Sequence, residues 1–158
     1  MADRYPMTPR GQKALKDELK HLKSVERPKI IEEVEVARAH GDLKENAEYH
    51  AAKEKYGFID GRINHINEKL AGAEVIDPKR LSGERVVFSS TVTLEDHDSG
   101  EELRYQIVGE DEADVKKGMI NFQSPIAKAL IGKELGEEVT IHTPKGQKIY
   151  EILGVEFI

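Results

Sequence analysis

The sequence predicts a two-domain α+β protein. An antiparallel coiled-coil hairpin of two long helices precedes a small domain made of an antiparallel sheet and a short helix. In the first half, apolar residues recur at heptad spacing, whereas in the second half they alternate with the period of two that is typical of strands. The charge divides at the same place, because residues 1–80 carry 16 Lys/Arg and 15 Asp/Glu whereas residues 81–158 carry 8 and 15. We therefore expect a hairpin at 1–78, a linker at 79–84 and a second domain at 85–158.

The second helix of the hairpin has the clearest pattern. Its apolar residues are separated by alternating steps of three and four, and they are Tyr49, Ala52, Tyr56, Ile59, Ile63, Ile66, Leu70 and Ala73. A strict seven-residue repeat of this kind predicts a helix that packs along one narrow seam, as in a coiled coil.

The first helix of the hairpin begins with Thr8 as N-cap and Pro9 at the first helical position. One apolar seam includes Leu19 and a second includes Ile30, and the heptad phase slips between them. Pro28 lies in the slip, so we expect a kink there. The chain then reverses at 41–46. Two helices of an ordinary bundle remain an alternative, although the sequence supplies no further long helices to cover them.

The second domain begins after Asp77-Pro78, which ends the helix. Strands are predicted at 85–88, 91–94, 103–108, 138–142 and 149–153. A short helix is predicted at 124–132, with Ser124 as N-cap, Pro125 at the first position and Gly132 after its end. These elements predict an antiparallel sheet covered by one helix.

Several functional classes are excluded by composition and motif. The chain has no Cys, so it has neither disulfides nor thiolate metal sites. A net charge of −6 argues against binding nucleic acid by overall charge. There is no phosphate-binding loop, dinucleotide fingerprint or zinc-protease motif. Without a secretory signal or an apolar segment of membrane-spanning length, we expect a cytoplasmic protein.

The turn of the hairpin concentrates acidic residues, Asp42, Glu45 and Glu48. Their spacing alone favours a structural role, in which Asp42 is the N-cap of the second helix and Glu45 completes a capping box. A functional interpretation is half of a Mg²⁺ site. Magnesium accepts one or two protein carboxylates and takes its other ligands from water and phosphate, so a partner would have to complete such a site.

The turn and several other segments resemble the Gre family of bacterial transcript cleavage factors, most closely the GreA type. The longest matching segment runs from Ala37 to Lys53 and contains Gly41-Asp42-Leu43-Lys44-Glu45-Asn46-Ala47-Glu48-Tyr49. Shorter matches lie in order along nearly the whole chain, at 7–11, 24–31, 61–63, 107–114 and 124–133.

The resemblance implies an elongation factor whose hairpin enters the secondary channel of RNA polymerase and whose second domain, of FKBP-like fold, docks at the rim. Asp42 and Glu45 match the residues that hold a Mg²⁺ ion jointly with the polymerase and orient the attacking water. Arg38 and Lys53 match basic residues that face the extruded RNA 3′ end. The polymerase performs the hydrolysis, so the factor is expected to be no enzyme by itself. We also expect it to be a monomer.

Some alternatives remain open. A Gre-like protein could bind the channel and inhibit or remodel polymerase without cleavage, or the chain could be a generic coiled-coil adaptor. Arg38 and Lys53 are equally explained as ordinary surface cations. Ser124 and Pro125 could contribute to polymerase docking, but a plain helix N-cap explains them and is preferred from the sequence.

Overall fold

The computed structural model describes residues 3–41 and 46–158. These residues form two compact units, a helical hairpin at 13–72 and a second unit that joins 4–12 to 73–158. This division differs from the predicted domains at residues 4–12 and 73–78. The physical reason is that β1 (Tyr5–Met7) pairs in parallel with β2 (Ala73–Val75), which brings the start of the chain to the second unit.

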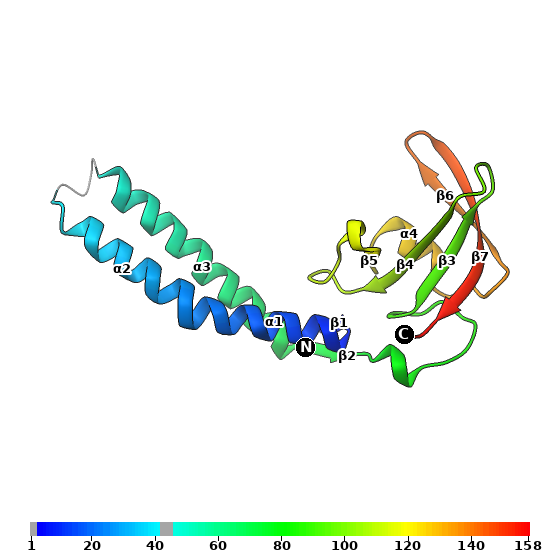
Figure 1. Cartoon of the computed structure of the whole chain (residues 1–158), viewed down its shortest axis with the longest axis horizontal. Coiled ribbons are helices and arrows are strands. Elements are labelled where there is room, and N and C mark those ends of the chain that lie inside the picture. Colours follow the sequence, from blue (N-terminus) through cyan, green and yellow to red (C-terminus); the bar gives the residue numbers. More distant parts are fainter. Residues whose placement is uncertain (1–2, 42–45) are drawn as a thin grey trace. The chain divides into compact units, whose positions relative to one another are not determined.

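The hairpin consists of α1 (Pro9–His21), a π-helical turn (Leu22–Glu26), α2 (Arg27–Arg38) and the antiparallel α3 (Ala47–Ala71) (Figure 1). Thr8 caps α1 as predicted, because its Oγ1 accepts a hydrogen bond from the Gly11 amide at 3.1 Å. The slip in heptad phase coincides with the π-helical turn, which ends two residues before Pro28. Proline has no amide to bond the carbonyl one turn earlier, so a locally wider turn at this position is physically reasonable.

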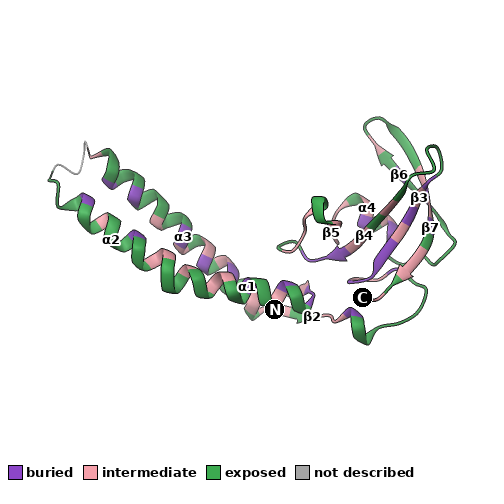
Figure 2. Cartoon of the chain, viewed as in Figure 1, coloured by how far each residue is buried: buried purple, intermediate pink, exposed green. Residues whose placement is uncertain are grey.

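The predicted seam is the core of the hairpin. Ile30 of α2 packs with Ala52, Ile59 and Ile63 of α3, and all four are buried. Figure 2 shows buried positions gathered where α2 and α3 face each other, with exposed residues on their outer sides. Toward the base, ion pairs join the two arms of the hairpin: Glu18 pairs with Arg62 at 2.6 Å and Arg27 with Asp60 at 3.4 Å.

The second unit is a five-stranded sheet in the order β5-β4-β3-β7-β6. Its strands are β3 (Thr91–Asp96), β4 (Glu102–Val108), β5 (Met119–Asn121), β6 (Glu138–Thr143) and β7 (Gly146–Glu156). The neighbours among β4, β3, β7 and β6 pair antiparallel, as expected. The edge strand β5 joins β4 in parallel, so the sheet is mixed. The helix α4 (Pro125–Leu130) buries Ala127 and Leu130 in the sheet's core.

One predicted strand is absent and three short ones were not predicted. Residues 85–88 form only an isolated bridge between Arg85 and Glu134, although the amide of Val86 still donates to the Lys133 carbonyl at 2.7 Å. The chain cannot continue as a strand because Ser89 has a φ of 76°. The unpredicted strands β1, β2 and β5 have three residues each, which is too short for a visible alternation.

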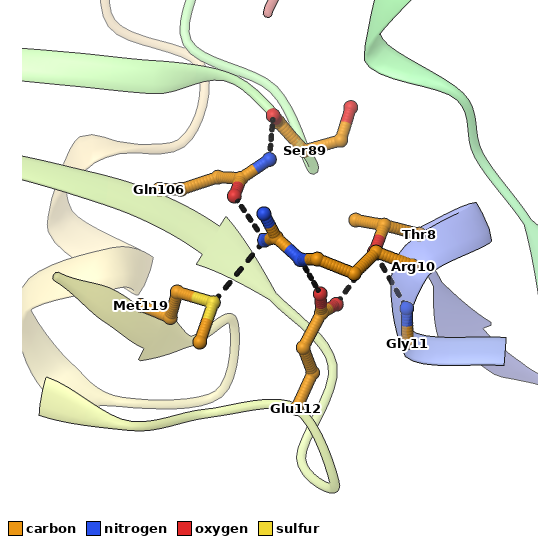
Figure 3. A network of polar contacts seen from close by, with 7 residues as sticks. All are labelled: Thr8, Arg10, Gly11, Ser89, Gln106, Glu112 and Met119. Atoms are coloured by element: carbon orange, nitrogen blue, oxygen red, sulfur yellow. Dashed lines mark hydrogen bonds and ion pairs between the residues drawn. The ribbon is translucent and has the colours of Figure 1, made fainter. Parts of the chain in front are cut away.

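A buried acid, Glu112, joins the segment that contains β1 to the rest of the second unit. The carboxylate of Glu112 accepts hydrogen bonds from Thr8 Oγ1 at 2.6 Å and from Arg10 Nε at 2.8 Å (Figure 3). Arg10 also donates to Gln106 Oε1 at 2.6 Å. With a side chain only 7% exposed, Glu112 is held in place by charge-assisted hydrogen bonds.

Candidate functional site at the tip of the hairpin

The candidate site lies where the hairpin reverses direction. Helix α2 ends at Arg38 and α3 begins at Ala47. The two predicted metal ligands, Asp42 and Glu45, fall between them and lie outside the described residues. The structure therefore bears on these acids through the residues on either side of them.

Asn46 is the N-cap of α3, and this overturns the capping role considered for the acids. Its side-chain Oδ1 accepts a hydrogen bond from the Tyr49 amide at 3.0 Å, which satisfies one of the free amides at the helix start. Its Nδ2 donates to the carbonyl oxygen of Ala37, in the last turn of α2, at 2.6 Å. One side chain thus caps α3 and ties it to α2, and Asp42 is not the N-cap.

Gly41 borders the other side of the two acids. Its amide donates to the Arg38 carbonyl at 3.3 Å and its φ is 106°, a region that residues with a Cβ rarely adopt. The tip segment 42–45 is therefore bounded by a glycine that the backbone requires and by an asparagine bonded to both helices.

The two predicted basic residues do lie together. Arg38 and Lys53 both line an open groove of about 530 Å³ on one side of the α2–α3 seam. We call it the tyrosine groove, and its lining residues are Ile31, Val34, Glu35, Arg38, Tyr49, Lys53 and Tyr56. The Lys53 ammonium lies 5.3 Å from the centre of the Tyr49 ring, a cation–π contact that favours a defined position for the charge. Cations beside aromatic rings suit contact with a single RNA strand.

The predicted docking residues belong to the second unit. Ser124 is the N-cap of α4, with its Oγ accepting from the Ala127 amide at 3.3 Å, and Pro125 is the first residue of the helix. The preferred prediction of a plain N-cap is thus confirmed. The docking role stays a prediction.

Asn46 is the residue of the site that sequence reasoning missed. Its signal was present, since asparagine directly before a helical pattern is a strong N-cap. Asp42 competed for the same role because it is equally suited to capping. In the described part of the chain, no group of three or more His, Asp or Glu side chains could hold a metal ion. Among the described helices, none is long and apolar enough to cross a membrane.

The comparisons with known proteins cover the whole chain. A family model described as "Transcription elongation factor, N-terminal" matches residues 5–75. A second, "Transcription elongation factor, GreA/GreB, C-term", matches residues 81–157. Proteins named "Transcription elongation factor GreA" from Phenylobacterium zucineum and Alkalilimnicola ehrlichii are 58% and 54% identical. These alignments span 99% of both chains in the first case and 98% in the second.

The chain is also similar to solved structures. GreA factor homolog 1 (Gfh1) of Thermus thermophilus is 27% identical, with a TM-score of 0.45 and coverage of 98% of this chain and 99% of that one. A GreA/GreB elongation factor from Nitrosomonas europaea is 22% identical, with a TM-score of 0.44 and coverage of 98% and 100%.

Proposed function

Because the chain belongs to the GreA/GreB family of transcription elongation factors, we propose that it binds bacterial RNA polymerase in the cytoplasm as a monomer. There it stimulates cleavage of a backtracked RNA 3′ end by the polymerase active centre. The factor lends side chains to that centre and has no hydrolytic activity when alone.

The observation that carries this proposal is the capping of α3 by Asn46. A helix start needs one good N-cap, and Asn46 supplies it. The carboxylates of Asp42 and Glu45 are therefore not required for capping, which was the strongest structural explanation for acids at this turn. Acids that are not needed as the N-cap of α3, at the end of a helical hairpin, are well suited to act inside a partner.

Asp42 and Glu45 would hold a Mg²⁺ ion jointly with polymerase carboxylates. Two carboxylates are the hard oxygen donors that this ion prefers. When bound, the ion would activate water and neutralise charge on the scissile phosphate. Asp42 and Glu45 would also orient the attacking water by accepting its hydrogen bonds.

Arg38 and Lys53 would contact the extruded RNA. Both are exposed and both line the tyrosine groove, so they can meet RNA phosphates on the same side of the hairpin. Each neutralised phosphate strengthens binding and makes it more sensitive to salt.

The test uses halted, backtracked elongation complexes of a bacterial RNA polymerase with Mg²⁺ and end-labelled RNA. Asp42→Asn and Glu45→Gln keep the size of each side chain and remove its charge. At saturating factor, each should lower the cleavage rate by at least about 100-fold, the scale of losing a catalytic electrostatic contact, while polymerase binding persists.

Glu54→Gln is the matched control, because Glu54 is an exposed acid on α3 away from the tip, and it should cleave like the wild type. If the double variant Asp42→Asn/Glu45→Gln cleaves as fast as the wild type, the mechanism is wrong. If the wild type binds polymerase without producing shorter RNA, the chain is a channel binder that acts without cleavage.

A further inference from the structure

The hairpin has a second groove on the other side of the α2–α3 seam from the tyrosine groove. It has a volume of about 610 Å³, and we call it the valine groove. Its lining residues are Lys29, Glu32, Glu33, Val36, Ala37, Glu48, Ala51, Ala52 and Lys55. In α3, Tyr49, Lys53 and Tyr56 form one stripe of the helix and Glu48, Ala51 and Lys55 form another, with the buried seam residue Ala52 between them. The two grooves therefore face in different directions.

The valine groove has an apolar floor that is open to solvent. Ala37 and Ala52 are buried beneath it, but Val36 is 56% exposed. Fully burying a valine side chain contributes roughly 1.5–3 kcal/mol, so covering Val36 with a partner would stabilise the complex. Apolar surface rimmed by charge is typical of a protein interaction site.

The charges around the valine groove have no partners within the described chain. None of its five charged side chains is in a hydrogen bond or ion pair with another described residue, and they are Lys29, Glu32, Glu33, Glu48 and Lys55. Nearer the base of the same hairpin, Glu18 pairs with Arg62 and Arg27 with Asp60. The hairpin thus has interhelical ion pairs nearer its base, whereas the charges around this groove have no partner among the described residues.

These charges are ordered along the hairpin. On α2, Glu32 and Glu33 lie about one turn closer to the tip than Lys29, and on α3, Glu48 lies two turns closer to the tip than Lys55. The tip end of the groove is therefore acidic and the base end is basic. A complementary surface would carry cations toward the tip, an apolar side chain over Val36, and acids toward the base.

We propose that the valine groove is the surface by which the hairpin contacts the protein wall of the polymerase channel, through a wall segment of that chemistry. This inference rests on the proposed function, in which the tyrosine groove faces RNA. A hairpin inside a channel must then turn its other groove toward protein. The two grooves would then have different partners: the valine groove contacts polymerase protein and the tyrosine groove contacts RNA.

The charge test compares Glu33→Lys with Glu35→Lys. Both residues are exposed on α2 and both changes alter the charge equally, but Glu33 lines the valine groove and Glu35 the tyrosine groove. Polymerase binding is followed with dye-labelled full-length factor, and cleavage is measured across factor concentration. Glu33→Lys should raise the dissociation constant and the half-saturating concentration at least about fivefold, with an unchanged maximal cleavage rate. Glu35→Lys should raise neither.

The apolar test compares Val36→Ser with Ile31→Ser, which lines the tyrosine groove and is 40% exposed. Only Val36→Ser should weaken polymerase binding. Equal effects from the two grooves, or no effect from either, would overturn the inference.

Sedimentation of each variant tests whether a second copy of this chain occupies the valine groove instead. If Val36→Ser abolishes self-association and leaves polymerase binding intact, a second copy covers the groove and the inference is wrong. If the wild-type protein does not bind polymerase, both proposals are wrong. If it binds polymerase but does not stimulate RNA cleavage, only the proposed function is wrong.

Discussion

Asn46 joins the two helices of the hairpin at its tip, by donating from Nδ2 to the Ala37 carbonyl oxygen at 2.6 Å while its Oδ1 accepts from the α3 backbone. An asparagine that uses both ends of its amide in this way fixes the chain directly after Glu45. The positions of α2 and α3 at the tip are thereby linked through one side chain.

Asn46→Ala is expected to destabilise the first turn of α3 by about 1 kcal/mol, the typical cost of losing an N-cap, and to lower the cleavage rate at saturating factor. Asn46→Asp is the informative companion, because it keeps an oxygen for the Tyr49 amide and loses the donor to Ala37. Hydrogen exchange of the amides at 47–50 measures the cap. If Asn46→Asp exchanges like the wild type but still cleaves slowly, the bond to Ala37 matters for positioning. Normal exchange and normal cleavage in Asn46→Ala would contradict the assigned role.

Replacing the tip acids should leave stability unchanged. Since Asn46 caps α3, Asp42→Ala and Glu45→Ala should each change the unfolding free energy by less than about 0.5 kcal/mol, the usual range for surface substitutions. Urea unfolding followed by circular dichroism measures this. A loss of about 0.5–2 kcal/mol in Asp42→Ala would indicate that the acid contributes to capping after all.

The elements that sequence predicted well are those with long, regular patterns. The α3 seam extends over several heptads, and Ile59, Ile63 and Ile66 are buried as their spacing requires. The phase slip between Leu19 and Ile30 indicated an irregularity, but a repeat cannot tell a proline kink from a π-helical turn. Residues 85–88 have the composition of a strand. The positive φ of Ser89, which ends their pairing, could not be predicted because a serine gives no sign of it in the sequence.

The candidate site was predicted in part for similar reasons. Arg38 is on α2 and Lys53 is on the facing helix α3, so the pairing of the two helices was sufficient to bring both residues to one groove. Asn46 was missed because two residues near the turn were equally suited to capping. The burial of Glu112 depends on Thr8 and Arg10, more than a hundred residues away in sequence, and no local pattern predicts such a contact.

Ser89→Gly should stabilise the second unit by about 1 kcal/mol. Ser89 is fully buried, its φ is 76°, and its Oγ has no hydrogen-bond partner among residues 3–41 and 46–158. Glycine removes the cost of the left-handed backbone and of the unpaired hydroxyl, and this outweighs the extra freedom of glycine in the unfolded chain. Ser90→Gly is the control and should destabilise, because Ser90 Oγ donates to the Val87 carbonyl at 2.7 Å. Thermal unfolding of both variants decides the matter, and a lower melting temperature in Ser89→Gly would refute the argument.

Asp96 should make the second unit less stable in acid. The amide of Asp98 donates to Asp96 Oδ1 at 2.9 Å, and this bond, aided by the Ser99 amide and the Lys148 ammonium, lowers the pKa of Asp96 against the opposing effect of burial. A carboxyl whose pKa is lower in the folded state stabilises the fold above its ordinary pKa. That contribution is lost as the pH falls through the lowered value, so the loss begins below about pH 4.

Urea unfolding across pH 2–6 measures this dependence. Asp96→Asn should flatten the fall in unfolding free energy below about pH 4. Lys148→Met separates the causes, because it removes an ammonium 3.5 Å from Asp96 Oδ2 and leaves the amide bonds in place. It should keep most of the acid sensitivity, since the Asp98 amide is the largest cause. If Lys148→Met flattens the pH dependence of the unfolding free energy as much as Asp96→Asn does, the ion pair with Lys148, and not the Asp98 amide, is the main cause of the lowered pKa of Asp96.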